Sequence, residues 1–142
     1  YPGKEENNHN EKYQLKAWDL DKPGNIRAEI ARVNAIRNKH EAFQRTFNIH
    51  FIPCSNSHII AYLKQNFEKT DRFIVVVNMD WENQQVGTLD LTPEALGLGH
   101  KGTLRLVDHF ANTPKEYLWD DKNPCLELNP QKCPAHIYQI VD

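Results

Sequence analysis

The carboxylates, histidines and tryptophans are the residues of this 142-residue chain that could do chemistry. Cleavage of a glycosidic bond needs two carboxyl groups flanking the bond, and acyl transfer needs a nucleophile beside a base and an oxyanion hole. The sequence contains no G-x-S-x-G, no G-x-x-x-x-G-K-[ST], no H-E-x-x-H and no calcium-binding loop. We therefore expect no catalytic residue of its own, no metal and no cofactor.

The histidines and aspartates support this interpretation by their positions. None of the seven histidines has a partner four residues away on a predicted helix, so we interpret them as surface or hydrogen-bonded residues. Most aspartates fall in predicted turns, where the side chain bonds its own backbone. The histidines are His9, His40, His50, His58, His100, His109 and His136, and the aspartates are Asp19, Asp21, Asp80, Asp90, Asp120 and Asp121.

Two tryptophans are candidates for stacking on sugar rings, whose C–H faces are apolar. Trp81 follows the apolar run 73–77 and is predicted to lie on a loop, which makes it the better platform; Trp119 is the second candidate. The alternative is that these rings pack over one end of the fold.

Composition excludes several classes of protein. The chain is 39% hydrophobic with 17 basic and 19 acidic residues, a globular profile without the basic stripe of a nucleic-acid-binding protein. No apolar run approaches the roughly 20 residues of a membrane span. Cys54, Cys125 and Cys133 are odd in number and form no C-x-x-C pair, so free thiols and a cytoplasmic location are expected.

One helix is predicted after a polar lead-in and a turn at residues 21–24. Asn25 is a candidate N-cap, and Ile26, Ile30, Val33 and Ile36 recur at steps of four, three and three, which predicts one apolar stripe. Lys39 and His40 suit the C-terminal end of a helix. Four aliphatic side chains on one helix face need a partner to pack against.

The rest of the chain has the pattern of an all-β fold. Short segments of strand character are separated by turn residues every eight to twelve positions, and the run 73–77 is apolar on both faces, as in a central strand. The fold class predicted is a mainly β, antiparallel β-sandwich preceded by one α-helix. The predicted strands are 47–52, 58–65, 72–79, 86–91, 103–108, 116–119, 125–128 and 135–141.

Several segments together resemble one part of a known family. They are residues 33–37 and 40–44 of the helix end, with 11–14 (EKYQ), 18–21 (WDLD), 23–26 (PGNI), 75–80 (VVVNMD), 91–98 (LTPEALGL), 117–119 (YLW) and 134–138 (PAHIY). They resemble the junction between the last barrel helix and the β-sandwich domain C in the α-amylase superfamily, glycoside hydrolase family 13. Among its members they are most similar to bacterial maltosyltransferases, which move maltose from maltose 1-phosphate onto α-1,4-glucan.

The resemblance implies a division of the chain and a mechanism. Residues 1–44 would be the lead-in and final helix of a truncated (β/α)8 catalytic barrel, and residues 45–142 the C-terminal β-sandwich. The retaining nucleophile and acid would lie upstream of Tyr1, in a longer parent enzyme. Lys12 and Tyr13 match the family's phosphate-binding Lys-Tyr pair, which suits a phosphate dianion. Glu41 stands where the family usually has Pro, which leaves the end of the helix uncertain by one turn.

The resemblance also implies partners and leaves alternatives. The expected partners are the parent's own catalytic barrel, α-glucan or maltose 1-phosphate bound through the parent, and a second copy paired through helix 26–38. By itself the chain is expected to be an accessory domain. Domain C of a hydrolytic α-amylase and a stand-alone carbohydrate-binding module remain open.

Overall fold

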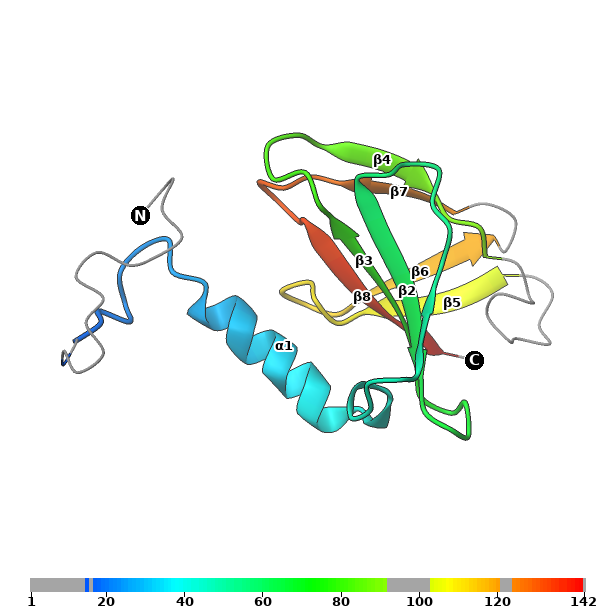
Figure 1. Cartoon of the computed structure of the whole chain (residues 1–142), viewed down its shortest axis with the longest axis horizontal. Coiled ribbons are helices and arrows are strands. Elements are labelled where there is room, and N and C mark those ends of the chain that lie inside the picture. The colour runs from blue at the N-terminus through cyan, green and yellow to red at the C-terminus, as the bar shows by residue number, and fades with distance from the viewer. Residues whose placement is uncertain (1–14, 16, 92–102, 121–123, 142) are drawn as a thin grey trace.

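A computed structural model describes residues 15, 17–91, 103–120 and 124–141 of the chain. Within these residues one α-helix and a short 3-10 helix precede a series of antiparallel strands (Figure 1), which confirms the predicted fold class. The elements are α1 (Arg27–Lys39), η1 (Glu41–Phe43), β1 (Ile49–Phe51), β2 (Ile59–Gln65), β3 (Arg72–Asn78), β4 (Gln85–Thr88), β5 (Thr103–Asp108), β6 (Lys115–Asp120), β7 (Cys125–Leu128) and β8 (Ala135–Val141). The helical turn expected around residues 93–96 lies outside the described residues.

The strands form one large sheet and one small sheet. The large sheet has the order β1-β2-β3-β8-β5-β6, and the small sheet pairs β4 with β7. All of these pairs are antiparallel. The main core is a cluster of aliphatic and aromatic side chains that joins the two sheets, with Leu126 and Leu128 of β7 among its members. The face of the large sheet that contributes to this cluster is called the inner face.

Strand β3 is buried on both faces, as its sequence predicts. Ile74 and Val76 belong to the main core, whereas Phe73 and Val75 point to the outer face and join a second cluster. Six of the seven β3 residues are buried, and the strand pairs with β2 on one side and β8 on the other. Phe and β-branched residues suit such a central position.

The second cluster fastens the end of α1 to the outer face. Ile36 of α1 and Ala42 of η1 pack with Phe73, Val75 and Ile137 of the large sheet. Each is buried, so the C-terminal turn of α1 is part of the folded unit.

Polar contacts reinforce this attachment. The C-cap of the helix is His40, whose backbone N–H donates to the Ile36 carbonyl. The His40 ring lies 3.0 Å from Asp71, and the other oxygen of that carboxylate accepts the Ala42 N–H. With Glu41 in place of proline, the chain ends α1 at Lys39 and continues as a 3-10 turn.

The rest of α1 extends away from the sandwich (Figure 1). Midway along it, the Arg32 guanidinium donates to the Phe110 carbonyl and the Asn112 side chain. Between residue 27, where α1 begins, and Arg32 the helix has no buried residue. The N-cap is Ile26 rather than the predicted Asn25, whose side-chain oxygen accepts the Arg27 N–H at 3.0 Å from one residue before the cap.

A close approach between β4 and the segment before β2 predicts a sensitive position. A Cβ at Gly87 would lie 2.7 Å from the Cys54 sulfur and 3.0 Å from the Ile59 Cδ1. Gly87→Ala is expected to lower the free energy of unfolding by about 1–3 kcal/mol, measured by urea denaturation, because the core has no room for the methyl group.

Cys54→Ala in the same chain is the matched control, because it removes the closest obstacle. The double variant should recover part of the stability lost by Gly87→Ala, relative to Cys54→Ala alone. A Gly87→Ala protein as stable as the wild type would contradict the packing at this site.

Candidate functional site

Two of the four predicted site residues, Trp81 and Trp119, are among the residues that the structure describes. Lys12 and Tyr13 lie outside the described residues. Trp119 is 8% exposed and its ring packs edge-on against Tyr138 of β8, with centroids 4.7 Å apart. Trp81 is 79% exposed and lies just after β3. Trp119 is thus a core residue in the structure, and Trp81 is the candidate whose ring is open to solvent.

The loop that carries Trp81, residues 79–84, is braced from both sides. The Asn78 side-chain oxygen accepts the Asp80 N–H at 2.8 Å, and its amide nitrogen donates to the Asn83 and Leu128 carbonyls. The Met79 N–H donates to the His58 carbonyl at 2.7 Å. The backbone before and after Trp81 is therefore tied to the end of the sandwich. We call residues 79–84 the Trp81 loop.

Asp80 is the second brace. Its carboxylate accepts the Glu82 and Asn83 N–H groups, the Asn83 side-chain amide and the Gln85 side-chain amide, at 2.8–3.1 Å. The bonds from Asn83 and Glu82 hold the pKa of this carboxyl at about 2. Asp80 therefore stays ionised and acts within the loop, as the turn chemistry of the sequence predicts.

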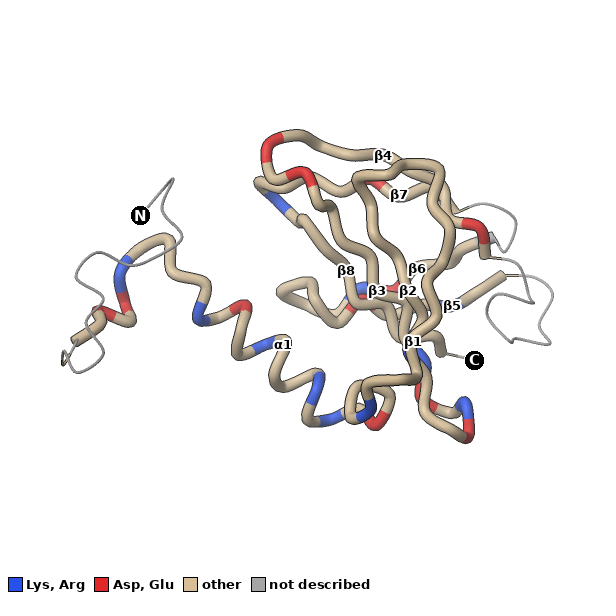
Figure 2. The backbone as a smooth tube through the Cα atoms, viewed as in Figure 1, with Lys and Arg blue, Asp and Glu red and all other residues tan. Residues whose placement is uncertain are grey.

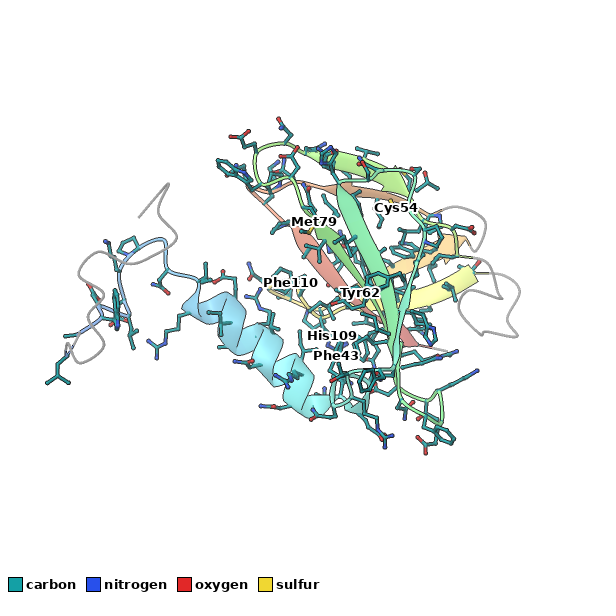
Figure 3. All side chains as sticks on the ribbon, viewed as in Figure 1. Phe43, Cys54, Tyr62, Met79, His109 and Phe110 are labelled. Atoms are coloured by element: carbon teal, nitrogen blue, oxygen red, sulfur yellow. The ribbon has the colours of Figure 1, made fainter. Side chains whose placement is uncertain are left out.

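A second turn lies beside the Trp81 loop. The Asn129 amide donates to the Gln84 side-chain oxygen at 3.0 Å, and its own side-chain oxygen accepts the Gln131 N–H. Figure 3 shows side chains gathered at this end of the sandwich, where Met79 is labelled. The Asn129 turn is thus joined by a side-chain hydrogen bond to the loop that carries Trp81.

A buried acid–base cluster is the feature that the sequence reasoning missed. Asp108 is fully buried, and its carboxylate lies 2.7 Å from His136 Nδ1 and accepts the N–H groups of Phe110 and Ile137. The Cys133 sulfur lies 3.7 Å from the same ring nitrogen. The signal in the sequence was Asp108 itself, which continues the inward alternation of Leu104 and Leu106 and so places a carboxylate in the core.

The pair is ionised in the folded protein. Burial by itself would lower the pKa of His136, but the hydrogen bond and charge of Asp108, with Cys133, raise it to about 9. Burial opposes ionisation of Asp108, yet His136 and the two N–H groups hold its pKa below the ordinary value. Burial and the nearby Asp108 charge raise the pKa of Tyr138, whose ring stacks on His136.

This geometry suits a structural role. The carboxylate has no access to solvent, and His136 Nδ1 is occupied by it. The pair joins the end of β5 to β8. No group of three or more His, Cys, Asp or Glu side chains placed to hold a metal is found among the described residues.

The His136–Asp108 pair predicts a pH dependence of stability. His136 has a raised pKa in the folded state, so its contribution is complete below its unfolded pKa of about 6.5 and is lost as the pH rises through about 9. The free energy of unfolding should fall by about 3 kcal/mol across this window, measured by denaturant titration at each pH. Asp108→Asn should remove this fall and destabilise the protein at pH 6.5.

Glu116→Gln is the control for the loss of one negative charge. Glu116 makes an exposed ion pair with Arg105, so the variant should keep the wild-type pH profile. An unchanged profile in Asp108→Asn would show that the buried pair does not supply the dependence.

The exposed part of α1 is the other unusual surface. Ile26, Ile30 and Val33 are 64%, 51% and 40% exposed, whereas Ile36 from the same predicted stripe is 7% exposed. Figure 2 shows basic residues recurring along this helix. We call Ile26, Ile30 and Val33 the α1 stripe. None of the helices among the described residues is long and apolar enough to cross a membrane.

The described cysteines Cys54, Cys125 and Cys133 are free, as predicted. In the part of the chain that the structure covers, Cys133 is the one within reach of a histidine ring.

Comparisons with known proteins identify relatives of the chain. It is 41% identical over 139 residues to the alpha-1,4-glucan:maltose-1-phosphate maltosyltransferase of Methylacidiphilum infernorum, a match that covers 98% of this chain and 20% of the relative. The protein of the same name from Chlorobaculum tepidum is 37% identical, and the match covers 99% of this chain and 22% of the relative. The chain thus spans about one fifth of the length of these curated relatives.

A solved structure from Bacillus halodurans C-125, described as an alpha-N-acetylgalactosaminidase, shares the fold. Its TM-score is 0.50 at 11% identity, over 70% of this chain and 21% of that chain. At this identity the likeness concerns the fold alone. Residues 51–140, most of the sandwich, match the family model described as GLGE, C-terminal. The chain therefore belongs to the GLGE C-terminal family.

Proposed function

We propose that this chain is the non-catalytic C-terminal part of a larger enzyme that transfers maltose from maltose 1-phosphate onto α-1,4-glucan. One observation carries the proposal. A match to a maltosyltransferase covers 98% of this chain but only 20% of the length of that relative. The expected role is to complete and stabilise the catalytic part.

Three of the described aspartates are held by contacts within the chain. Retaining transfer at a sugar needs a nucleophile and an acid about 5–5.5 Å apart in an open site. Asp71 holds His40 and the Ala42 N–H, Asp80 braces its loop, and Asp108 is buried with His136. Because the chain matches only 20% of the relative, the proposal places the nucleophile and the acid in the remaining part of the parent, in a (β/α)8 barrel.

Residues 1–44 would belong structurally to that barrel, with α1 as its final helix. The α1 stripe supports this assignment, because three aliphatic side chains on one helix face are left exposed while Ile36 packs on the sandwich. Burying each such side chain contributes about 1.5–3 kcal/mol. The catalytic part of the parent would cover the stripe. When the chain is alone, a second copy would take its place.

Self-association of the chain tests this use of α1. The chain should form dimers at high concentration, measured by sedimentation equilibrium, and Ile30→Glu should shift it to monomer without changing its melting temperature, because Ile30 is 51% exposed. Ala35→Glu adds the same charge at an exposed position on the opposite side of α1 and should leave the association unchanged. A wild-type chain that stays monomeric at high concentration would argue against the proposal.

Phosphate release tests the proposed division of labour. The chain alone, given maltose 1-phosphate and glycogen, should release no phosphate above background, and the longer enzyme should release it. Lys12→Met in the longer enzyme should lower kcat/KM for maltose 1-phosphate about 10- to 100-fold, because a charge-assisted bond to the phosphate is lost. The KM for glucan should not change. Turnover by the isolated chain would refute the proposal.

A further inference from the structure

We propose that the Trp81 loop is a holding site for α-1,4-glucan, separate from the site of chemistry. This inference rests on the proposed function, which supplies the class of polymer. Its geometric basis is the pairing of an open indole ring with a braced loop and neighbouring amide side chains. It makes the sandwich a second point of contact with the growing polymer.

The ring of Trp81 is suited to a sugar face. It is 79% exposed, and Met79, two residues earlier in the same loop, is 57% exposed, so this loop presents apolar area to water. The faces of glucose units carry C–H groups that pack on an aromatic ring, and covering the ring removes apolar surface from water. Trp119, the other candidate, is already covered by the core.

The braces on the loop lower the cost of binding. Asn78 and Asp80 together hold the backbone of residues 80, 82 and 83 through short hydrogen bonds, so the loop does not have to be ordered when a ligand arrives. Preorganisation of this kind leaves more of the contact free energy for affinity. Asp80 also stays ionised through the neutral range, so the brace persists there.

Amide side chains supply the polar half of the site. A glucan chain presents hydroxyl groups at the edges of its rings, and these need donors and acceptors. Gln84 lies three residues after Trp81 in the same loop and is joined to Asn129 at 3.0 Å, with Gln131 in the same turn. Amide groups offer both donors and acceptors, so they suit hydroxyl-rich ligands.

The location separates this site from the α1 attachment. Asp71, which binds His40, comes just before β3, and Trp81 comes just after it, so the two lie at opposite ends of a seven-residue strand, roughly 20 Å apart. Figure 1 shows the β3–β4 loop at the far end of the sheet from η1. A polymer at Trp81 would therefore leave the anchored end of α1 uncovered.

Affinity electrophoresis of the chain in gels with and without glycogen tests the site. The wild type should be retarded by glycogen and not by dextran, whose linkages are α-1,6. Trp81→Ala should weaken the apparent affinity about tenfold, as expected for the loss of one aromatic contact. Phe67→Ala is the matched control, because Phe67 is 84% exposed in the β2–β3 turn, at the other end of the sheet.

The outcomes separate the inference from the proposed function. An apparent affinity for glycogen that falls about tenfold in Trp81→Ala and stays at the wild-type value in Phe67→Ala supports the site. Equal retardation of both variants, or no retardation of the wild type, overturns it. In either case phosphate release by the longer enzyme still decides the proposed function. Equal retardation by dextran also overturns the assignment, because it shows no preference for α-1,4-glucan.

Discussion

The large sheet of this domain is apolar on both faces, and this constraint shapes the rest of the structure. A sheet with one apolar face could leave the other in water, but Phe73 and Val75 of β3 point away from the main core and still have to be covered. Ile36 and Ala42 provide that cover, and His40 and Asp71 hold the end of the helix in place. The end of the helix is thus part of the packing of the sandwich.

The same constraint explains why the last turn of α1 is buried on one side while the turns before it are exposed. Its last turn has buried contacts, but the sheet offers no surface to the turns before it, so the α1 stripe stays exposed. A helix of 13 residues is marginal in water by itself, because most helical stability comes from packing. The hydrogen bond from the Arg27 N–H to Asn25 and the bonds of Arg32 contribute to holding it, and a covering partner would contribute far more.

The sequence predicted the strands well because their signal is local. Alternation in residues 103–108 and the doubly apolar run 73–77 are set by burial on one face or on two, and the structure confirms both. The strand order was beyond reach, because pairing β8 with both β3 and β5 depends on contacts across the whole chain. The same is true of the Asp108–His136 pair, whose residues are 28 positions apart.

In the candidate sites too, features set by neighbouring residues in the sequence were predictable, and features set by residues far apart in the sequence were not. Loop residues around Trp81 were predictable, because a turn follows a central strand and Asp80 favours such a turn. The exposure of the two tryptophans was not, because it depends on which strands lie next to each ring. Trp119 meets Tyr138 across β5, whereas Trp81 is left 79% exposed by the residues that the structure describes. An exposed tryptophan on a loop held by seven hydrogen bonds combines a rigid support with an uncovered ring. Folding alone does not require that combination, which is why we assign it to binding.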